Sequence, residues 1–513
     1  MMKKVNGTNS RKNFDKKPKS FYSRPNFLEE PLLKRVIHAG AWAFGLRIVN
    51  QLFSMIRIVI LARILSPNDF GLFGIAVLAL SALETFSQTG FQAALIQKNE
   101  DIRTYLDTAW MIQIIRALII ALILIGTAPF IANFFKTPAA NGIIQVVGLS
   151  VLFQGFINVG VIYFQKELEF HKEFIYILSG NLADLIFAIV AAFTLRNAWA
   201  LVFGLLAGNI VRLIVSYLIH PYRPRFRIEG KKVKELYTFG KWILGSSILF
   251  FVVTHGDDIF VSKVLGITAL GLYLIAYRLS ELPVTEITSV VKAVTFPAYS
   301  KLQGNTAKLK RAFLQTFEAV VFATLPISIG IFILGPDFIR VFLGSKWTEM
   351  IFALQILSIS GFIQSITAPV GSLFWAVGQP KIGFIMNATR VLIMGILIYP
   401  LSLKLGITGT ALSVLAGSIM KVPIFLTYAK KIMGVDVSEL WTRIRNYLVI
   451  NLSAGLFTLI FQRSLYQPGL MFFIEESTVF IIIFVTISYL IWKHYGIEPL
   501  SIFKQIKRQA QGE

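Results

Sequence analysis

Residues 117–132 read Ala-Leu-Ile-Ile-Ala-Leu-Ile-Leu-Ile-Gly-Thr-Ala-Pro-Phe-Ile-Ala and contain no charged side chain. They lie inside an apolar segment near residues 106–132. About 20 apolar residues are enough for a helix to cross the hydrocarbon core of a bilayer. Backbone polar groups in that core must bond within their own segment, which favours a helix. The stretch therefore predicts a transmembrane helix.

The rest of the chain has the same character. Of its 513 residues, 55% are hydrophobic and 15% are charged, and the mean hydropathy is +0.67. An apolar share of this size could supply about fourteen spans. We expect an all-α integral membrane protein with apolar segments near residues 37–62, 70–95, 106–132, 141–163, 174–195, 198–219, 242–264, 270–296, 313–334, 350–376, 382–403, 406–428, 447–462 and 470–492.

Lys and Arg residues are distributed unevenly across the predicted membrane. The side that holds the N-terminus has 34 of them in its loops and tails, and the opposite side has eight. Cytoplasmic loops carry the excess of positive charge, so both termini are predicted to be cytoplasmic. The basic N-terminal tail is then expected to contact anionic lipids rather than nucleic acid. Its first 30 residues lack the apolar core of a cleaved signal peptide, which predicts an uncleaved first span in the plasma (inner) membrane.

Several function classes are excluded by composition. The chain has no Cys, so disulfides, thiolate metal sites and Cys nucleophiles are absent, and its five His residues lack metal-ligand spacing. No Gly-rich nucleotide loop with a following Lys-Ser or Lys-Thr is present, which argues against an ATP-driven pump. The longest internal loops have about twenty residues, too few for a catalytic domain of the kind a membrane glycosyltransferase would need. We expect no catalytic residues, metal or cofactor.

The two halves of the chain repeat one another at an offset of 200 residues. Arg63 is matched by Lys263, and at a slightly larger offset Arg212 is matched by Lys421. Six spans separate equivalent positions, so both halves should insert with the same orientation around an axis along the membrane normal. Such repeats are typical of transporters that work by alternating access. The identical pairs include Gly40, Trp42, Gly45, Leu65, Gly71, Ile75 and Ala76, which return as Gly240, Trp242, Gly245, Leu265, Gly271, Ile275 and Ala276.

The repeat and the loops together predict the organisation of the chain. Two six-helix bundles lie between basic cytoplasmic segments, and two further spans lie outside the duplication. The predicted parts are a basic cytoplasmic tail (1–36), an N-terminal six-helix bundle (37–219), a basic cytoplasmic loop (220–241), a C-terminal six-helix bundle (242–430), a cytoplasmic loop (431–446), two extra transmembrane helices (447–492) and a cytoplasmic tail (493–513).

Eight cations lie inside or at the edges of the predicted spans. A charged side chain at the centre of a membrane helix costs about 2.5–3.5 kcal/mol, so these groups should face the protein interior or a water-filled cavity. Arg212 and Lys421 lie near helix ends, from which they can reach the interface. Either the others line a substrate path or they form a structural network of ion pairs. The candidates for the path are Arg47, Arg57, Arg116, Arg278 and Arg390, and the candidates for coupling or gating acids are Asp257, Asp258 and Glu84.

One pairing follows from the repeat. Arg57 occupies the position equivalent to Asp257, and Asp258 is adjacent. We therefore expect Arg57 to form an interior pair with Asp257 or Asp258 that can open and close. The alternative places both Asp residues in water at the outer mouth. Because the planar guanidinium matches phosphate and carboxylate oxygens, a cationic cavity would suit an anionic substrate.

Two stretches of the first half resemble a known family. They are residues 61–72, Leu-Ala-Arg-Ile-Leu-Ser-Pro-Asn-Asp-Phe-Gly-Leu, and residues 90–97, Gly-Phe-Gln-Ala-Ala-Leu-Ile-Gln. The second half adds Asp257-Asp258, Leu270-Gly271-Leu272-Tyr273 and Phe296-Pro297-Ala298. Over about residues 37–430 the chain resembles Wzx-type polysaccharide flippases of the multidrug/oligosaccharidyl-lipid/polysaccharide (MOP) superfamily.

That resemblance implies two pseudo-symmetric six-helix bundles in a V around a central cavity, plus two C-terminal helices. It implies export of polyprenyl-pyrophosphate-linked oligosaccharide repeat units from the cytoplasmic to the outer leaflet, for lipopolysaccharide or exopolysaccharide synthesis, with a polysaccharide polymerase as partner. Two alternatives belong to the same superfamily: a drug or cation exporter and a flippase of lipid-linked peptidoglycan precursors. The excess of Arg within the spans argues against the cation exporter, whose cavity should favour acids.

Overall fold

The computed structural model describes residues 32–88, 102–167, 169–230, 251–465 and 469–495, together with residues 91, 95 and 233. Within these ranges every regular element is a helix, which confirms the all-α prediction. Ten helices are long and apolar enough to cross a membrane, or eleven if one bent pair is a single span. The number fourteen stays a prediction.

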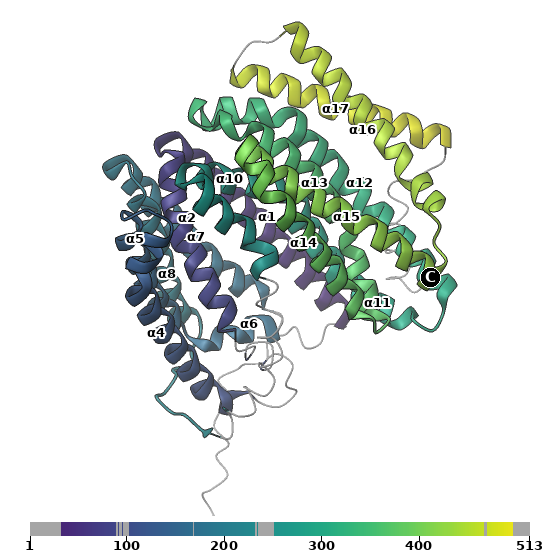
Figure 1. Ribbon diagram of the computed structural model, residues 1–513. Coiled ribbons are helices and arrows are strands. Elements are labelled where there is room, and N and C mark those ends of the chain that lie inside the picture. The colour runs from purple at the N-terminus through teal and green to yellow at the C-terminus, as the bar shows by residue number, and fades with distance from the viewer. Residues whose placement is uncertain are drawn as a thin grey trace, which may run out of the picture.

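Helices of the N-terminal half cover the first six predicted spans, and α2, α4, α5, α7 and α8 lie together on the left of Figure 1. The fourth span is the bent pair, with 70° between α5 and the segment that contains α6. The elements are α1 (Leu32–Ile64), α2 (Pro67–Phe86), α4 (Arg103–Phe134), α5 (Ala140–Gly155), η2 (Val159–Val161), α6 (Ile162–Lys166), α7 (Phe170–Leu195) and α8 (Trp199–Ile219).

The C-terminal half begins in the described part of the chain with helical residues 251–260. Its eighth predicted span, near 270–296, is not one helix, because α10 ends at Ser280 and α11 begins with Pro283 in its first turn, where a backbone N–H is missing. The elements are η3 (Val261–Leu265), α10 (Ile267–Ser280), α11 (Leu282–Leu302), α12 (Thr306–Phe338), η4 (Ile339–Leu343), η5 (Ser345–Met350), α13 (Ile351–Ala376), α14 (Pro380–Leu405) and α15 (Ile407–Met433).

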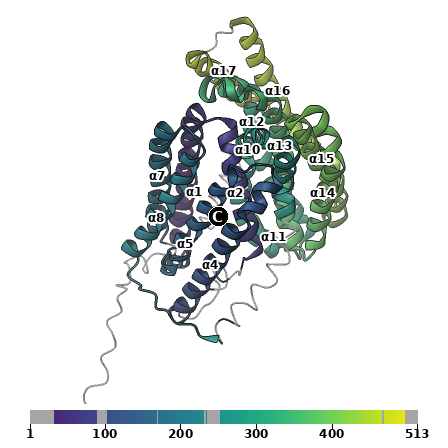
Figure 2. The ribbon, with the colours of Figure 1, turned by 60° about the vertical axis from the view of Figure 1, so that its left-hand side comes forward.

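Two further helices, α16 (Val437–Leu465) and α17 (Leu470–Tyr495), pack against each other and against α12. They lie at the outer edge of the C-terminal half in both ribbon views (Figures 1 and 2). Arg443 and Tyr447 of α16 both donate to the Glu318 carboxylate of α12. These helices therefore flank the C-terminal half.

The start of α2 is fixed by the Ser-Pro-Asn-Asp stretch quoted above. The Ser66 hydroxyl accepts from the Asp69 backbone N–H, and the Asp69 carboxylate accepts from the Ser66 N–H at 2.9 Å, with Pro67 in the first turn. This reciprocal cap satisfies two N–H groups that the first turn leaves unpaired. It sets the position of α2 at one end of the molecule, which we call the Ser66 end. The opposite end, where residues 220–230 connect to the N-terminal half, is the linker end.

The halves meet where α2 crosses α10, side by side near the Ser66 end. A Cβ atom on Gly71 would lie 2.0 Å from the Ile267 carbonyl oxygen, and one on Gly271 would lie 1.8 Å from the Pro67 carbonyl oxygen. Gly71 and Gly271 are equivalent positions of the sequence repeat, so the contact is made twice. Only glycine permits this approach, because the atoms that a Cβ would meet belong to backbone.

The largest apolar core of the described residues joins the halves at the Ser66 end, and Phe86 at the other end of α2 makes a further contact with Phe251, with ring centres 5.1 Å apart. The core at the Ser66 end includes Leu61 and Ile75 from the N-terminal half together with Leu272 and Trp347 from the C-terminal half. Towards the linker end the N-terminal half has a separate core around Trp110, and the C-terminal half has another around Phe313. The described residues thus pack as one body at the Ser66 end and as two at the linker end.

Candidate functional site

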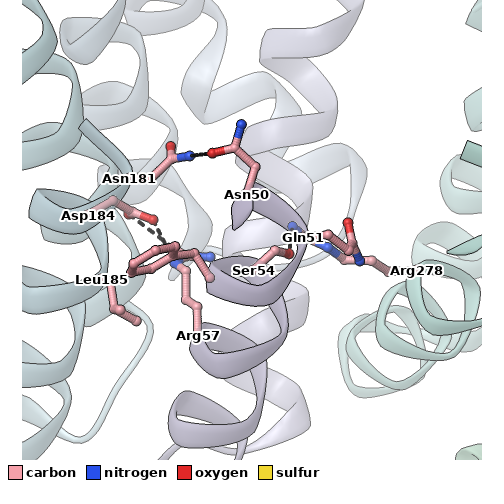
Figure 3. A pocket seen from close by; sticks show the side chains of 9 residues that line it. Asn50, Gln51, Ser54, Arg57, Asn181, Asp184, Leu185 and Arg278 are labelled. Carbon is pink, nitrogen blue, oxygen red and sulfur yellow. Dashed lines mark hydrogen bonds and ion pairs between the residues drawn. The ribbon is translucent and has the colours of Figure 1, made fainter. Parts of the chain in front are cut away.

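A polar pocket of about 370 Å³ lies between α1, α7 and α10. Figure 3 shows α1 in the middle, with α7 on one side and Arg278 of α10 on the other. The lining residues are Asn50, Gln51, Phe53, Ser54 and Arg57 from α1, Asn181, Asp184 and Leu185 from α7, and Arg278 from α10. On α1 the spacings of three and four residues place the polar side chains on one face.

Arg57 is held by a carboxylate of its own half. Its Nε lies 2.7 Å from Asp184 Oδ2, and its Nη2 donates to Asp184 Oδ1 at 3.2 Å. The two side chains are 17% and 21% exposed. The Nη2 contact is a hydrogen bond and the Nε contact is an ion pair by distance, and together they hold the guanidinium beside the carboxylate. Arg57 is therefore oriented in the pocket, with Nη1 outside the pair.

Arg278 reaches the pocket from the other half. Its Nη2 donates to the Ser54 hydroxyl of α1 at 2.5 Å, and the side chain is exposed within the pocket region. In the part of the chain that the structure describes, no carboxylate forms an ion pair with Arg278. The pocket thus has two guanidinium groups, one from each half, and one carboxylate.

A second layer of hydrogen bonds holds α7. Asn181 Nδ2 donates to Asn50 Oδ1 at 2.8 Å, and Arg212 of α8 donates to Asn181 Oδ1 at 2.5 Å. The C-terminal half has the same arrangement, because Lys421 of α15 donates to Asn387 of α14 at 2.9 Å. In both halves a cation on the sixth helix thus bonds to an asparagine on the fifth.

Arg390 lies away from this pocket, in the interior of the C-terminal half. It is 5% exposed, and its Nη1 donates to Gln364 Oε1 at 3.0 Å. Asp257 and Tyr277 are within electrostatic range of its guanidinium. Arg390 therefore belongs to a buried polar network rather than to the pocket between the halves.

The expected pair between Arg57 and Asp257 or Asp258 is not formed. Asp257 accepts from the Tyr273 hydroxyl at 2.7 Å, and Asp258 Oδ2 lies 3.0 Å from His255 Nδ1. The pairing differs because α7 packs directly against α1 and brings Asp184 to Arg57. The alternative, with both acids in water, is also wrong, since Asp257 and Asp258 are 2% and 7% exposed.

Arg116 and Glu84 meet at the C-terminal end of α2. Arg116 donates to the Glu84 carbonyl oxygen and to the Ser87 hydroxyl, both at 2.9 Å. A cation at this position stabilises the unpaired carbonyls and the negative end of the helix dipole. Arg116 thus anchors α2. The side chain of Arg47 lies outside the described residues.

The structure therefore brings together two of the five predicted path residues, Arg57 and Arg278. The pocket also contains residues that the sequence reasoning did not select, above all Asp184, Asn181 and Asn50. In the sequence these residues are polar side chains within apolar spans, spaced three or four residues apart. That pattern indicates a polar helix face turned away from lipid.

The Ser66 end carries a second pair of contacts between the halves. Arg63 donates to the Val341 carbonyl at the end of the third helix of the C-terminal half, and Lys263 donates to the Phe134 carbonyl at the end of α4. We call these two contacts the cation clasps. Trp347 adds a hydrogen bond from its Nε1 to the Ala62 carbonyl at 3.0 Å and is fully buried. The Ser66 end is thus closed by polar as well as apolar contacts.

At the linker end, residues 220–230 are bonded to the N-terminal half. Asp107 of α4 accepts from the Tyr222 hydroxyl and from the Arg225 N–H, the latter at 2.8 Å. His220 Nδ1 accepts from the Tyr222 N–H at 3.2 Å. Burial, with Lys172 adding positive charge nearby, lowers the pKa of His220 to about 4. A neutral His220 therefore fastens the linker at neutral pH.

Ten or eleven helices of the described residues can cross a membrane, and the polar pocket is lined from both halves of the repeat. Such an arrangement is typical of a membrane transporter. The model of the family described as polysaccharide biosynthesis protein matches residues 60–352. The chain belongs to this family.

Relatives and a solved structure agree with that assignment. The lipopolysaccharide biosynthesis protein WzxC of Escherichia coli (strain K12) is 25% identical over 361 residues, 70% of this chain and 73% of that protein. The succinoglycan biosynthesis transport protein ExoT of Rhizobium meliloti (strain 1021) is 26% identical over 327 residues, 64% of each chain.

The solved structure is the lipid II flippase MurJ in an inward closed conformation. It matches with a TM-score of 0.71 and 17% identity, over 88% of this chain and 99% of that one. At this identity the match shows the fold. The resemblance to Wzx-type flippases of the MOP superfamily is thus confirmed. The protein is a multi-pass membrane transporter of polysaccharide biosynthesis and not an enzyme.

Proposed function

We propose that this protein flips oligosaccharide repeat units linked to polyprenyl pyrophosphate from the cytoplasmic to the outer leaflet of the plasma (inner) membrane. The observation that carries the proposal is the pocket to which both halves contribute a guanidinium, Arg57 from α1 and Arg278 from α10. A group bound there touches both halves, so its binding can be coupled to their movement.

The chemistry of the pocket suits a phosphorylated saccharide. Guanidinium groups match phosphate oxygens in geometry and charge. The amides of Asn50, Gln51 and Asn181 and the hydroxyl of Ser54 can exchange hydrogen bonds with sugar hydroxyls. A cationic drug would meet two like charges here and one carboxylate already paired, which disfavours the exporter alternative.

The distribution of Lys and Arg supports an orientation. With both termini cytoplasmic, the Ser66 end faces the outside and the linker end faces the cytoplasm. The core that joins the halves at the Ser66 end and the separate cores at the linker end then correspond to an inward-facing state of a V-shaped transporter. Export requires the α2–α10 contact to open and the linker end to close.

The proposal has two further parts, a partner and a set of coupling acids. A flipped repeat unit is consumed by a polymerase in the outer leaflet, which makes a polysaccharide polymerase the expected partner. Asp257, Asp258 and Glu84 are proposed as coupling or gating acids, because the first two are buried beside the Arg390 network and Glu84 lies beside the Arg116 anchor.

The test measures lipid-linked glycan in each leaflet after deletion of the gene and complementation with wild type, Arg57→Ala or Arg278→Ala. We expect intermediate to accumulate in the cytoplasmic leaflet of the deletion strain and of both variants, at normal membrane levels of protein. Lys404→Gln is the control, since this cation is exposed outside the pocket. Normal glycan in the deletion strain, with loss of small-molecule efflux or of peptidoglycan precursor flipping, would replace the proposal.

A further inference from the structure

The Arg57 guanidinium has a carboxylate partner before any substrate is bound. Asp184 takes the edge formed by Nε and Nη2, with distances of 2.7 and 3.2 Å. Both side chains line the pocket, and neither is fully buried. A phosphate that approaches Arg57 therefore meets a guanidinium whose charge is already paired with Asp184.

The position of Asp184 is fixed by the packing of α7 on α8. A Cβ atom on Gly204 would lie 2.7 Å from Asp184 Oδ1, and one on Gly208 would lie 3.1 Å from Asp184 Cβ. These glycines leave the space that the aspartate occupies. The Asp184 carboxylate therefore lies against α8 on one side and is paired with Arg57 on the other.

The two guanidinium groups of the pocket have different partners. Arg278 bonds to the Ser54 hydroxyl, and no carboxylate of the described residues forms an ion pair with it, although Asp184 lies within electrostatic range. Two cations and one anion leave the lining with a formal charge of +1. Without Asp184 the formal charge of the lining would be +2. The lining would then neutralise more of the negative charge of a bound phosphate.

We propose that Asp184 limits the affinity of the pocket for the phosphate part of the substrate, as a resident counter-anion that competes for Arg57. This inference rests on the proposed function. A carrier must bind its substrate strongly enough to load it and weakly enough to release it, as ion pores must. Asp184 supplies repulsion toward a phosphate in the loaded state and re-forms its pair with Arg57 after release.

The test uses the purified full-length protein and inorganic pyrophosphate as the probe, with binding measured by calorimetry. Asp184→Asn keeps the shape and one acceptor for Arg57 but removes the charge. We expect it to bind pyrophosphate roughly tenfold more tightly than wild type, as removal of a like charge in a partly buried site allows. Asp184→Glu should bind as wild type does. In cells, Asp184→Asn should flip the lipid-linked glycan more slowly despite its tighter binding.

Two controls separate charge from folding. Asp107→Asn makes the same charge change at the linker end, outside the pocket, and should leave affinity unchanged. Asp184→Ser is a second neutral variant in case Asn disturbs the packing of α7 on α8, and it should also bind more tightly.

The outcomes are distinguishable. Weaker or unchanged binding by the folded neutral variants, with wild type still dependent on Arg57, overturns the role of Asp184 and leaves the proposed function intact. Wild type that binds no pyrophosphate, and does not differ from Arg57→Ala, overturns the cationic pocket and the inference with it.

Discussion

Arg63 and Lys263 stand 200 positions apart at equivalent points of the repeat, and each donates to a backbone carbonyl of the opposite half. Both carbonyls belong to the end of a third helix, where a cation is favourable because the last carbonyls lack helical partners. Lys263 also lies 4.1 Å from the centre of the Phe134 ring. The two clasps must break if the Ser66 end is to open.

Removal of both clasps should shift the protein toward a state open at the Ser66 end. We expect the double variant Arg63→Gln, Lys263→Gln to label faster at a cysteine placed at Leu65, which is fully buried in the core that joins the halves. The chain has no native Cys, so a membrane-impermeant maleimide reports on this site alone. The parent protein carries only Leu65→Cys. Lys404→Gln combined with Leu65→Cys should label as slowly as this parent. Equal rates for all three proteins would exclude a role for the clasps.

A methyl group at the α2–α10 crossing should force the halves apart. Gly71→Ala and Gly271→Ala each place a Cβ about 2 Å from a backbone oxygen, where no side chain can yield. Overpacking of this kind costs about 1–3 kcal/mol. We expect a lower melting temperature in detergent and reduced flipping. Gly126→Ala is the matched control, because a Cβ atom there meets open space. An equal loss of stability and flipping in Gly126→Ala would show that the close approach of α2 and α10 is not the cause.

Arg390 and Arg57 should respond differently to truncation. Arg390→Ala leaves Gln364 without its donor and removes a cation from the surroundings of the buried Asp257, and a buried polar group without its partner costs about 1–3 kcal/mol. We therefore expect Arg390→Ala to lower the amount of folded protein in the membrane. Arg57→Ala should keep that amount and lose activity. Quantitative immunoblots beside the leaflet assay distinguish the two, and normal levels of Arg390→Ala would contradict the structural role.

Acid should loosen the linker. The pKa of His220 is lowered to about 4, below the value of about 6.5 for an unperturbed histidine, so the fastened state binds fewer protons than a released one between these values. The contribution of the neutral imidazole is present above pH 6.5 and declines as the pH falls toward 4. Proteolysis at residues 220–230 should thus be faster at pH 5 than at pH 7. In His220→Gln this difference should disappear; a difference that persists would point to another group.

The sequence predicted the positions of the helices well, because apolar runs and the repeat report directly on burial in lipid. It predicted one span near 270–296, whereas α10 ends at Ser280 and α11 begins at Leu282; Glu281 and Pro283 mark this break in the sequence, but the apolar residues on both sides of it outweighed them. Partners of charged residues were harder still. The repeat suggested Asp257 for Arg57, whereas the packing of α7 on α1 supplied Asp184, and helix neighbours are not readable from a single sequence.

The pocket draws eight of its nine residues from helices α1 and α7 and a single one, Arg278, from the C-terminal half. The counterpart of Arg57 in that half, Asp257, is buried in a network of its own. If the pocket binds the substrate as proposed, the N-terminal copy supplies most of the contacts that recognise it. A chimaera with residues 32–219 from a relative should therefore inherit the glycan preference of the relative while keeping the conformational cycle of this protein.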